Sequence, residues 1–129
     1  MRYLSKKEKK GIQDKLPKGD IIYKDNNKYL IVEDDNYLPH LGSINEGVYK
    51  SVYVDKGAIP HILKGADLMR PGISKVDEDI EKNEIIQVKD ENFNKTIALG
   101  HSLLSSKDLK IQEAGKSVKI FHFFKDEKY

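Results

Sequence analysis

From Val48 onward, the chain is divided into short β-type segments, and this pattern limits the possible folds more than any other feature. The segments span residues 48–54, 68–76, 84–89, 96–104 and 117–124, and each is bounded by Gly, Asn, Asp or Ser. Several short strands at such spacing, separated by turn residues, are typical of a small barrel. We therefore expect this part of the chain to be mainly β.

One short helix is expected between the first two β segments, over residues 57–65. Its apolar residues Ile59, Ile62 and Leu63 fall on one helical face. Pro60 would lie in the first turn, where a missing N–H is tolerated, and Gly65 stands where a left-handed C-terminal cap is expected. We expect this helix to pack against the barrel through its single apolar face.

The first 47 residues follow a different pattern and predict a small α+β module. Ser5 and Glu8 form a possible capping box for a helix over residues 4–16, and residues 20–32 suggest a hairpin that turns near Asp25. Residues 36–47 have turn chemistry and little periodicity. The boundary is therefore placed near residue 47, with the module over 1–47 and a second domain over 48–129.

The composition removes several kinds of chemistry. No Cys is present, which excludes disulfides, thiolate metal sites and a cysteine nucleophile. His40, His61 and Asp55 could be drawn together with a serine as a triad, but no Gly-x-Ser-x-Gly elbow accompanies them. The acidic runs at residues 33–35 and 77–79 lack the spacing of a calcium-binding loop. We predict no catalytic residues, no metal site and no cofactor.

Charge is unevenly distributed along the chain. Residues 1–28 hold nine Lys and Arg against four Asp and Glu, a net of +5, whereas the rest carries 14 against 17, or −3. Such asymmetry favours an anionic partner, although a solvated Lys-rich helix explains it equally well. No apolar run approaches the roughly 20 residues needed to cross a bilayer, so we expect a cytoplasmic protein without membrane contact.

The residues from Tyr53 to Gly72, which end in Asp-Leu-Met-Arg-Pro-Gly, closely resemble the opening of the PUA domain. The resemblance continues in the same order through residues 85–90, 96–106 and 115–122. It is strongest with archaeal single-PUA proteins related to the malignant T-cell-amplified translation factor and to ligatin. It implies a C-terminal pseudobarrel that binds structured RNA, often at a tRNA acceptor end, and work in translation at the small ribosomal subunit.

The resemblance also implies where RNA would bind, because the helix and the following strand face RNA in PUA domains. Glycines permit close approach of a backbone, and Lys and Arg supply donors to phosphate. The candidate RNA-binding residues are Lys64, Gly65, Ala66, Arg70 and Gly72, with Lys56 and Lys75 added as further cations. A structural alternative is that Gly65 caps the helix, residues 70–72 form a barrel corner and Lys64 is solvated.

Histidine, tyrosine and asparagine residues of the β segments each allow a structural interpretation. His101 and His122 lie in strand patterns, where a lone histidine is more often a hydrogen-bonded structural residue than a ligand. Tyr53 could stack on RNA bases, or it could be a half-buried residue that packs against the sheet. Asn83 stands where the family usually has Gly, a change that Asn tolerates because it also accepts positive φ.

Two functional hypotheses follow. The first is a non-catalytic RNA-binding accessory factor for tRNA or small-subunit ribosomal RNA in translation or tRNA metabolism. The second is a protein-interaction adaptor for a translation or modification partner, or a detached RNA-binding subunit of a tRNA or rRNA modification enzyme. The chain has no room for a large catalytic domain of its own.

Overall fold

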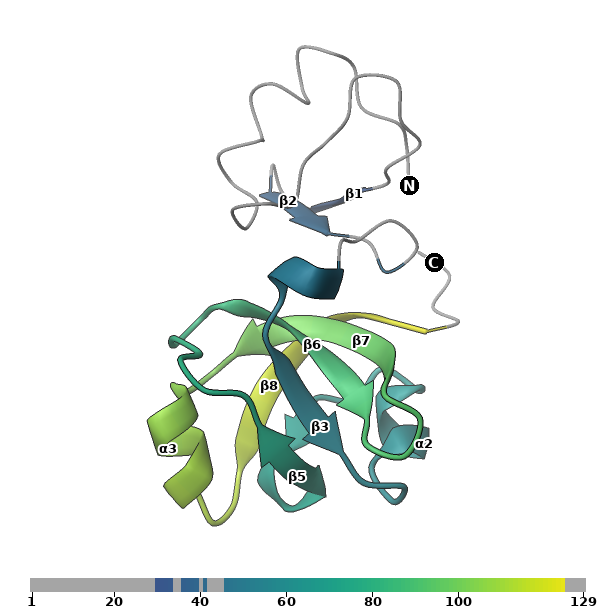
Figure 1. Cartoon of the computed structure of the whole chain (residues 1–129). Coiled ribbons are helices and arrows are strands. Elements are labelled where there is room, and N and C mark those ends of the chain that lie inside the picture. Colours follow the sequence, from purple (N-terminus) through teal and green to yellow (C-terminus); the bar gives the residue numbers. More distant parts are fainter. Residues whose placement is uncertain (1–29, 34–35, 40, 42–45, 125–129) are drawn as a thin grey trace.

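The computed structural model describes residues 30–33, 36–39, 41 and 46–124 (Figure 1). The helix predicted over 4–16 and the hairpin turn near Asp25 lie outside the described residues. The predicted domain boundary at residue 47 stays a prediction.

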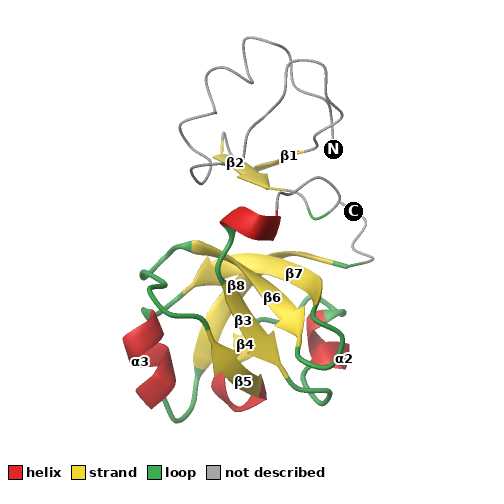
Figure 2. Ribbon diagram, in the orientation of Figure 1, coloured by secondary structure: helices red, strands yellow, loops and turns green. Residues whose placement is uncertain are grey.

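A six-stranded sheet forms the body of the described structure, as the β segments predict (Figure 2). Its order is β4-β8-β7-β6-β3-β5. The strands are β3 (Ser51–Val54), β4 (Leu68–Met69), β5 (Ile73–Val76), β6 (Ile85–Asp90), β7 (Lys95–Ser102) and β8 (Lys116–Phe123). Only the β3–β6 pair is parallel among the pairings of this sheet. The two edge strands, β4 and β5, are joined directly by the 3-10 turn η3 (Arg70–Gly72), so the sheet curls until its edges meet.

The core lies inside this curled sheet. Alternate residues point inward, as the period of two in a strand requires, and Val52, Val54, Ile86 and Val88 are fully buried. Leu68 and Val118 extend the same cluster from β4 and β8.

The helix α2 (Ile59–Ile62) forms within the predicted span and packs as expected. Pro60 lies in its first turn, and Ile62 is buried in the core with Ile59 and Leu63 packed against it. Gly65 has φ of +91°, which confirms the left-handed position after the helix. The helix is shorter than the predicted span of 57–65 because Leu63 to Gly65 form turns.

Two expectations for the barrel were wrong. Residues 68–76 do not form one strand, because η3 turns the chain between β4 and β5. The helix α3 (Ser106–Ile111) was not expected at all, although its sequence signal was present. Ser105 is its N-cap and accepts a hydrogen bond from the backbone N–H of Asp108.

The segment before the barrel contains a second, two-stranded sheet. Strands β1 (Leu30–Glu33) and β2 (Asn36–Pro39) pair antiparallel, so the expectation of irregular structure from residue 36 was wrong for β2. The 3-10 turn η2 (Glu46–Val48) then leads into β3.

Hydrogen bonds join this segment to the barrel. The buried amide of Gln87 donates to the carbonyl oxygens of Glu46 and Tyr49, at 3.0 Å each. The backbone N–H of Leu41 donates to Nδ1 of His122 at 3.1 Å. No helix among the described residues is long and apolar enough to span a membrane.

The histidine and asparagine predictions are confirmed. His122 is fully buried, and Nδ1 of His101 lies 3.3 Å from the carbonyl oxygen of Asn83. Both rings are thus hydrogen-bonded parts of the structure. Asn83 has φ of +70°, the conformation that its side chain tolerates better than most.

Candidate functional site

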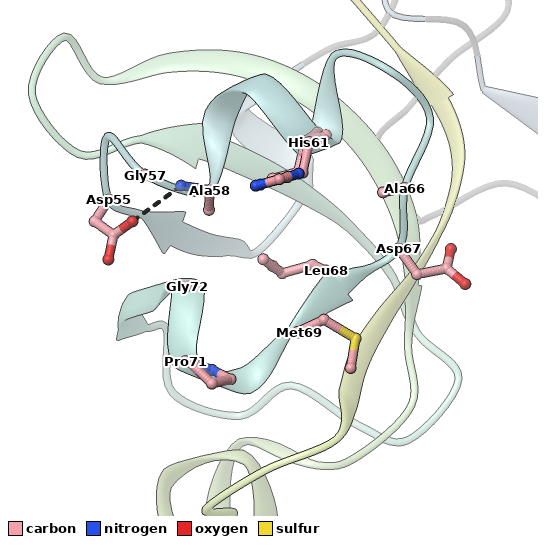
Figure 3. Close-up of a pocket in the computed structure, with 11 residues that line it drawn as sticks. Asp55, Gly57, Ala58, His61, Ala66, Asp67, Leu68, Met69, Pro71 and Gly72 are labelled. Carbon is pink, nitrogen blue, oxygen red and sulfur yellow. Dashed lines mark hydrogen bonds between the residues drawn. The ribbon is translucent and has the colours of Figure 1, made fainter.

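A pocket of about 480 Å³ lies between α2 and the β4–η3 corner. Figure 3 shows His61 of α2 on one side and Met69 and Pro71 on the other. The remaining wall is mostly apolar or small, formed by Gly57, Ala58, Ile62, Ala66, Leu68 and Gly72, and Asp55 and Asp67 complete it. The pocket is therefore a mostly apolar slot with the imidazole ring of His61 at one side.

The two pocket carboxylates are already engaged in holding the walls. Oδ1 of Asp55 accepts the backbone N–H of Ala58 at 3.1 Å, which fixes the start of α2. Oδ1 of Asp67 accepts the N–H of Ile120 at 2.9 Å, and its Oδ2 lies 3.4 Å from Nζ of Lys116. These contacts compensate part of the negative charge beside the pocket.

Among the residues that the structure describes, no Lys or Arg lines the pocket, and two lysines lie instead at the ends of α2. Lys56 precedes the helix and Lys64 follows it, and both are exposed. Neither ammonium group forms an ion pair with any residue in the described part of the chain. Positive charge therefore lies outside an apolar pocket. This arrangement suits a ligand with a flat, uncharged group that enters the pocket and an anionic backbone that stays at the surface.

The predicted glycines serve the protein's own packing. At Gly72, a Cβ atom would lie 2.7 Å from Cβ of Ala58, so the missing side chain lets η3 approach the start of α2. At Gly65, a Cβ would lie 3.1 Å from the ring of Phe123. Ala66, in contrast, is exposed at the pocket wall. Their predicted contact with RNA stays a prediction.

Arg70 is held by backbone carbonyl groups on two sides. Its Nε donates to the carbonyl of Leu109 at 2.7 Å, and its Nη1 donates to that of Ile73 at 3.2 Å. The carbonyl of Leu109 belongs to the last turn of α3, where carbonyls lack helical partners and favour a cation. These bonds give Arg70 a structural role, whereas its predicted role as an RNA ligand stays a prediction.

We expect Arg70→Met to lower the free energy of unfolding by about 2 kcal/mol, because hydrogen bonds from a charged donor contribute 1.5–3 kcal/mol. Arg70→Lys should not restore it, since an ammonium group cannot span both carbonyls as the planar guanidinium does. Urea denaturation measures both variants. If Arg70→Met left the stability unchanged but weakened RNA binding, Arg70 would instead be a residue that contacts RNA.

Lys75 lies apart from the other candidates. It is exposed on β5, does not line the pocket, and places Nζ 5.2 Å from the ring centroid of Tyr53. The structure thus gathers Lys56, Lys64, Gly65, Ala66 and Gly72 around α2, and separates Lys75 from them.

Of the residues that line the pocket, sequence reasoning named only Ala66 and Gly72 as RNA-binding candidates; it missed, among others, Asp55, His61 and Met69. Asp55 carried a usable signal, because an Asp followed closely by Gly is typical of a turn, and its Oδ1 accepts the N–H of Ala58 in the turn that precedes α2. Met69 is 46% exposed, which is unusual for a large apolar side chain and marks the pocket edge. No group of three or more candidate metal ligands occurs within the described residues.

Comparison with known proteins agrees with this architecture. The PUA domain model matches residues 50–124. An uncharacterized protein of Methanocaldococcus jannaschii is 34% identical, over 84% of this chain and 68% of its own length. Translation machinery-associated protein 20 of Saccharomyces cerevisiae is 29% identical over 71% of this chain. The matched region spans only 55% of the length of the yeast protein.

A solved structure extends the similarity to nearly the whole chain. A conserved PUA domain protein from Thermoplasma acidophilum superposes with a TM-score of 0.71 at 29% identity, covering 96% of this chain and 93% of that one. The family match covers more than half of the sequence, and the curled six-stranded sheet is the pseudobarrel that the resemblance implied. The chain therefore belongs to the PUA domain family.

Proposed function

We propose that this protein is a non-catalytic RNA-binding factor whose pocket between α2 and the β4–η3 corner receives an unpaired nucleotide of a structured RNA. PUA domains are RNA-binding modules, which supports the general class. The observation that carries the specific proposal is an apolar pocket whose helix has, at each end, a lysine that forms no ion pair with the described residues.

The pocket chemistry favours a base over a phosphate group. A phosphate buried among Ile62, Leu68 and Met69 would lose hydration with no cation lining the pocket. A base can instead lie against apolar side chains and the His61 ring, as single-stranded RNA commonly does on protein surfaces. The phosphates on either side of that base would then reach Lys56 and Lys64.

The preferred RNA is tRNA or small-subunit ribosomal RNA, bound in translation or tRNA metabolism. The similarity to a protein named for its association with the translation machinery supports this context. The 3′ end of tRNA is an unpaired extension of a stem, which matches a pocket for an unpaired nucleotide beside surface cations.

Binding of tRNA with and without its 3′ single-stranded end tests the pocket. We expect Ala66→Glu, which places a carboxylate at the pocket wall, to weaken binding of intact tRNA at least tenfold. The same variant should change the affinity for truncated tRNA by less than threefold, because that RNA has no unpaired end to lose. Fluorescence anisotropy at fixed salt measures both affinities.

Ala114→Glu is the matched control, because Ala114 is exposed in the turn between α3 and β8 and does not line the pocket. It adds the same charge to the protein. Equal weakening by both variants would contradict the pocket as the site, and so would wild-type protein that binds both tRNAs equally well.

A further inference from the structure

We infer that the outer face of β5, β3 and β6 carries a second RNA contact, in which Lys75 and Lys89 bind phosphate groups on either side of Tyr53. This inference rests on the proposed RNA binding and extends it to a surface outside the pocket. The three residues are called the Lys–Tyr–Lys row.

Strand register builds the row. Tyr53 lies opposite Lys75 in the antiparallel β3–β5 pair and opposite Lys89 in the parallel β3–β6 pair. Val52 and Val54, on either side of Tyr53, are fully buried in the core. Because successive residues of a strand point to opposite faces, Tyr53 points outward.

The row is accessible. Figure 1 shows the β3 and β5 strands turned toward the viewer between α3 and α2, with neither helix lying over them. Lys75 is exposed, while Tyr53 and Lys89 are partly exposed.

The polar groups of the row have no ion-pair or hydrogen-bond partner within the described chain, and the Lys75 ammonium lies only against the Tyr53 ring. Neither lysine forms an ion pair there, and the Tyr53 hydroxyl makes no hydrogen bond there. Other lysines of the barrel do pair with carboxylates, namely Lys50 with Glu84, Lys110 with Glu78 and Lys116 with Asp67. Lys75 and Lys89 therefore form no ion pair with the described residues and are available to bind an external anion.

The spacing of the row suits a nucleic-acid backbone. Neighbouring strands lie about 4.8 Å apart, so the backbones that carry the two lysines are separated by about 10 Å across Tyr53. Lys75 already lies over the Tyr53 ring, which keeps that cation on the outer face. Two cations with an aromatic residue between them are the combination that binds phosphates and stacks bases without sequence preference.

The row and the pocket are close enough for one RNA to reach both. Strand β3 ends at Val54, and Asp55, only two residues after Tyr53, lines the pocket. Two residues of extended chain span about 7 Å. An RNA with one base in the pocket would therefore extend its neighbouring backbone along the row.

The test compares a double variant, Lys75→Glu with Lys89→Glu, against a matched pair, Lys82→Glu with Lys107→Glu. The control lysines are exposed and form no ion pair with described residues, so the total charge change is the same. The probes are an RNA hairpin with an unpaired 3′ tail and the same hairpin without it. Affinity is measured across a KCl series for three unrelated stem sequences.

We expect the row variant to reduce the slope of log affinity against log salt by about 2, or about 1 for each lost phosphate contact. The loss should be equal for all three sequences and should persist on the hairpin without a tail. The control pair should leave the slope unchanged. The neutral pair Lys75→Gln with Lys89→Gln should reproduce the slope loss, and thermal melting verifies that each variant is folded.

An unchanged slope in the row variants, or an equal loss in the control pair, would overturn the row while leaving the pocket intact. Failure of the proposed function has a different signature, because wild-type protein would then bind neither hairpin, even at low salt.

Discussion

Gly100→Ala is expected to lower the free energy of unfolding by about 3 kcal/mol, at the upper end of the usual cost of overpacking a core. A Cβ at Gly100 would lie 2.6 Å from the carbonyl oxygen of Lys119 and 2.6 Å from Cγ1 of Val118. Gly100 is buried in β7, at an irregularity in its pairing with β8. Because one clash is with backbone, β7 and β8 would have to separate, and guanidinium denaturation would measure the loss.

Gly57→Ala is the control for this substitution. Its Cβ would have only one near neighbour, Oδ1 of Asp55 at 3.4 Å, which is ordinary contact. We expect this variant to change stability by less than 1 kcal/mol. A similarly small effect at Gly100 would show that the β7–β8 pairing adjusts without cost and that the strands are not closely packed at this position.

Gln87→Leu is expected to cost about 3 kcal/mol although it preserves side-chain volume. Gln87 is 1% exposed, donates to two carbonyl oxygens and accepts from the Thr96 hydroxyl at 2.7 Å. Leucine would remove a donor from the buried carbonyl of Tyr49 and an acceptor from the buried Thr96 hydroxyl, and each unsatisfied buried group costs about 1–3 kcal/mol. Chemical denaturation gives the stability change.

Gln112→Leu provides the comparison, because its amide makes a similar set of bonds near the surface. Gln112 donates to the carbonyls of Ala114 and Lys116 and accepts from the Ser117 hydroxyl. Water can replace most of these bonds, so we expect a loss below about 1.5 kcal/mol. Equal losses at the two glutamines would mean that burial does not set the cost.

The sequence predicted the elements whose signals are local. The Pro60 position, the left-handed Gly65 and the positive φ of Asn83 each depend on the conformational preference of one residue, and each is confirmed. The other four β segments each contain a strand, because apolar alternation and turn residues mark them separately, whereas the segment 68–76 is divided by η3.

The candidate site could be predicted only in part, because its geometry depends on contacts between distant segments. Residues around α2 could be named from the resemblance, but the pocket forms where α2 meets the β4–η3 corner. Likewise, the bond from Arg70 to Leu109 joins residues 39 positions apart. No local pattern shows that this arginine is engaged within the protein, whereas an exposed Lys64 could be expected from its sequence position.

The missed helix α3 illustrates a different limit. Its cap was visible in the sequence, but six residues are too few for a clear apolar period, and Ile111 is 73% exposed. Tertiary contacts, including the buried Leu109, stabilise this short helix more than its own propensity does.

The pairing of β4 with β8 has a consequence for how the chain folds during synthesis. Leu68 pairs with Val118, and β8 is the strand that joins β4 to the rest of the sheet through β7. While the ribosome has not yet released β8, β4 lacks its neighbour and the apolar face of the sheet stays open to solvent. Such distant pairings are slow to form because a long loop must close first. The barrel is therefore expected to close only after β8 has been made, and nascent chains that lack β8 are expected to be the more aggregation-prone species.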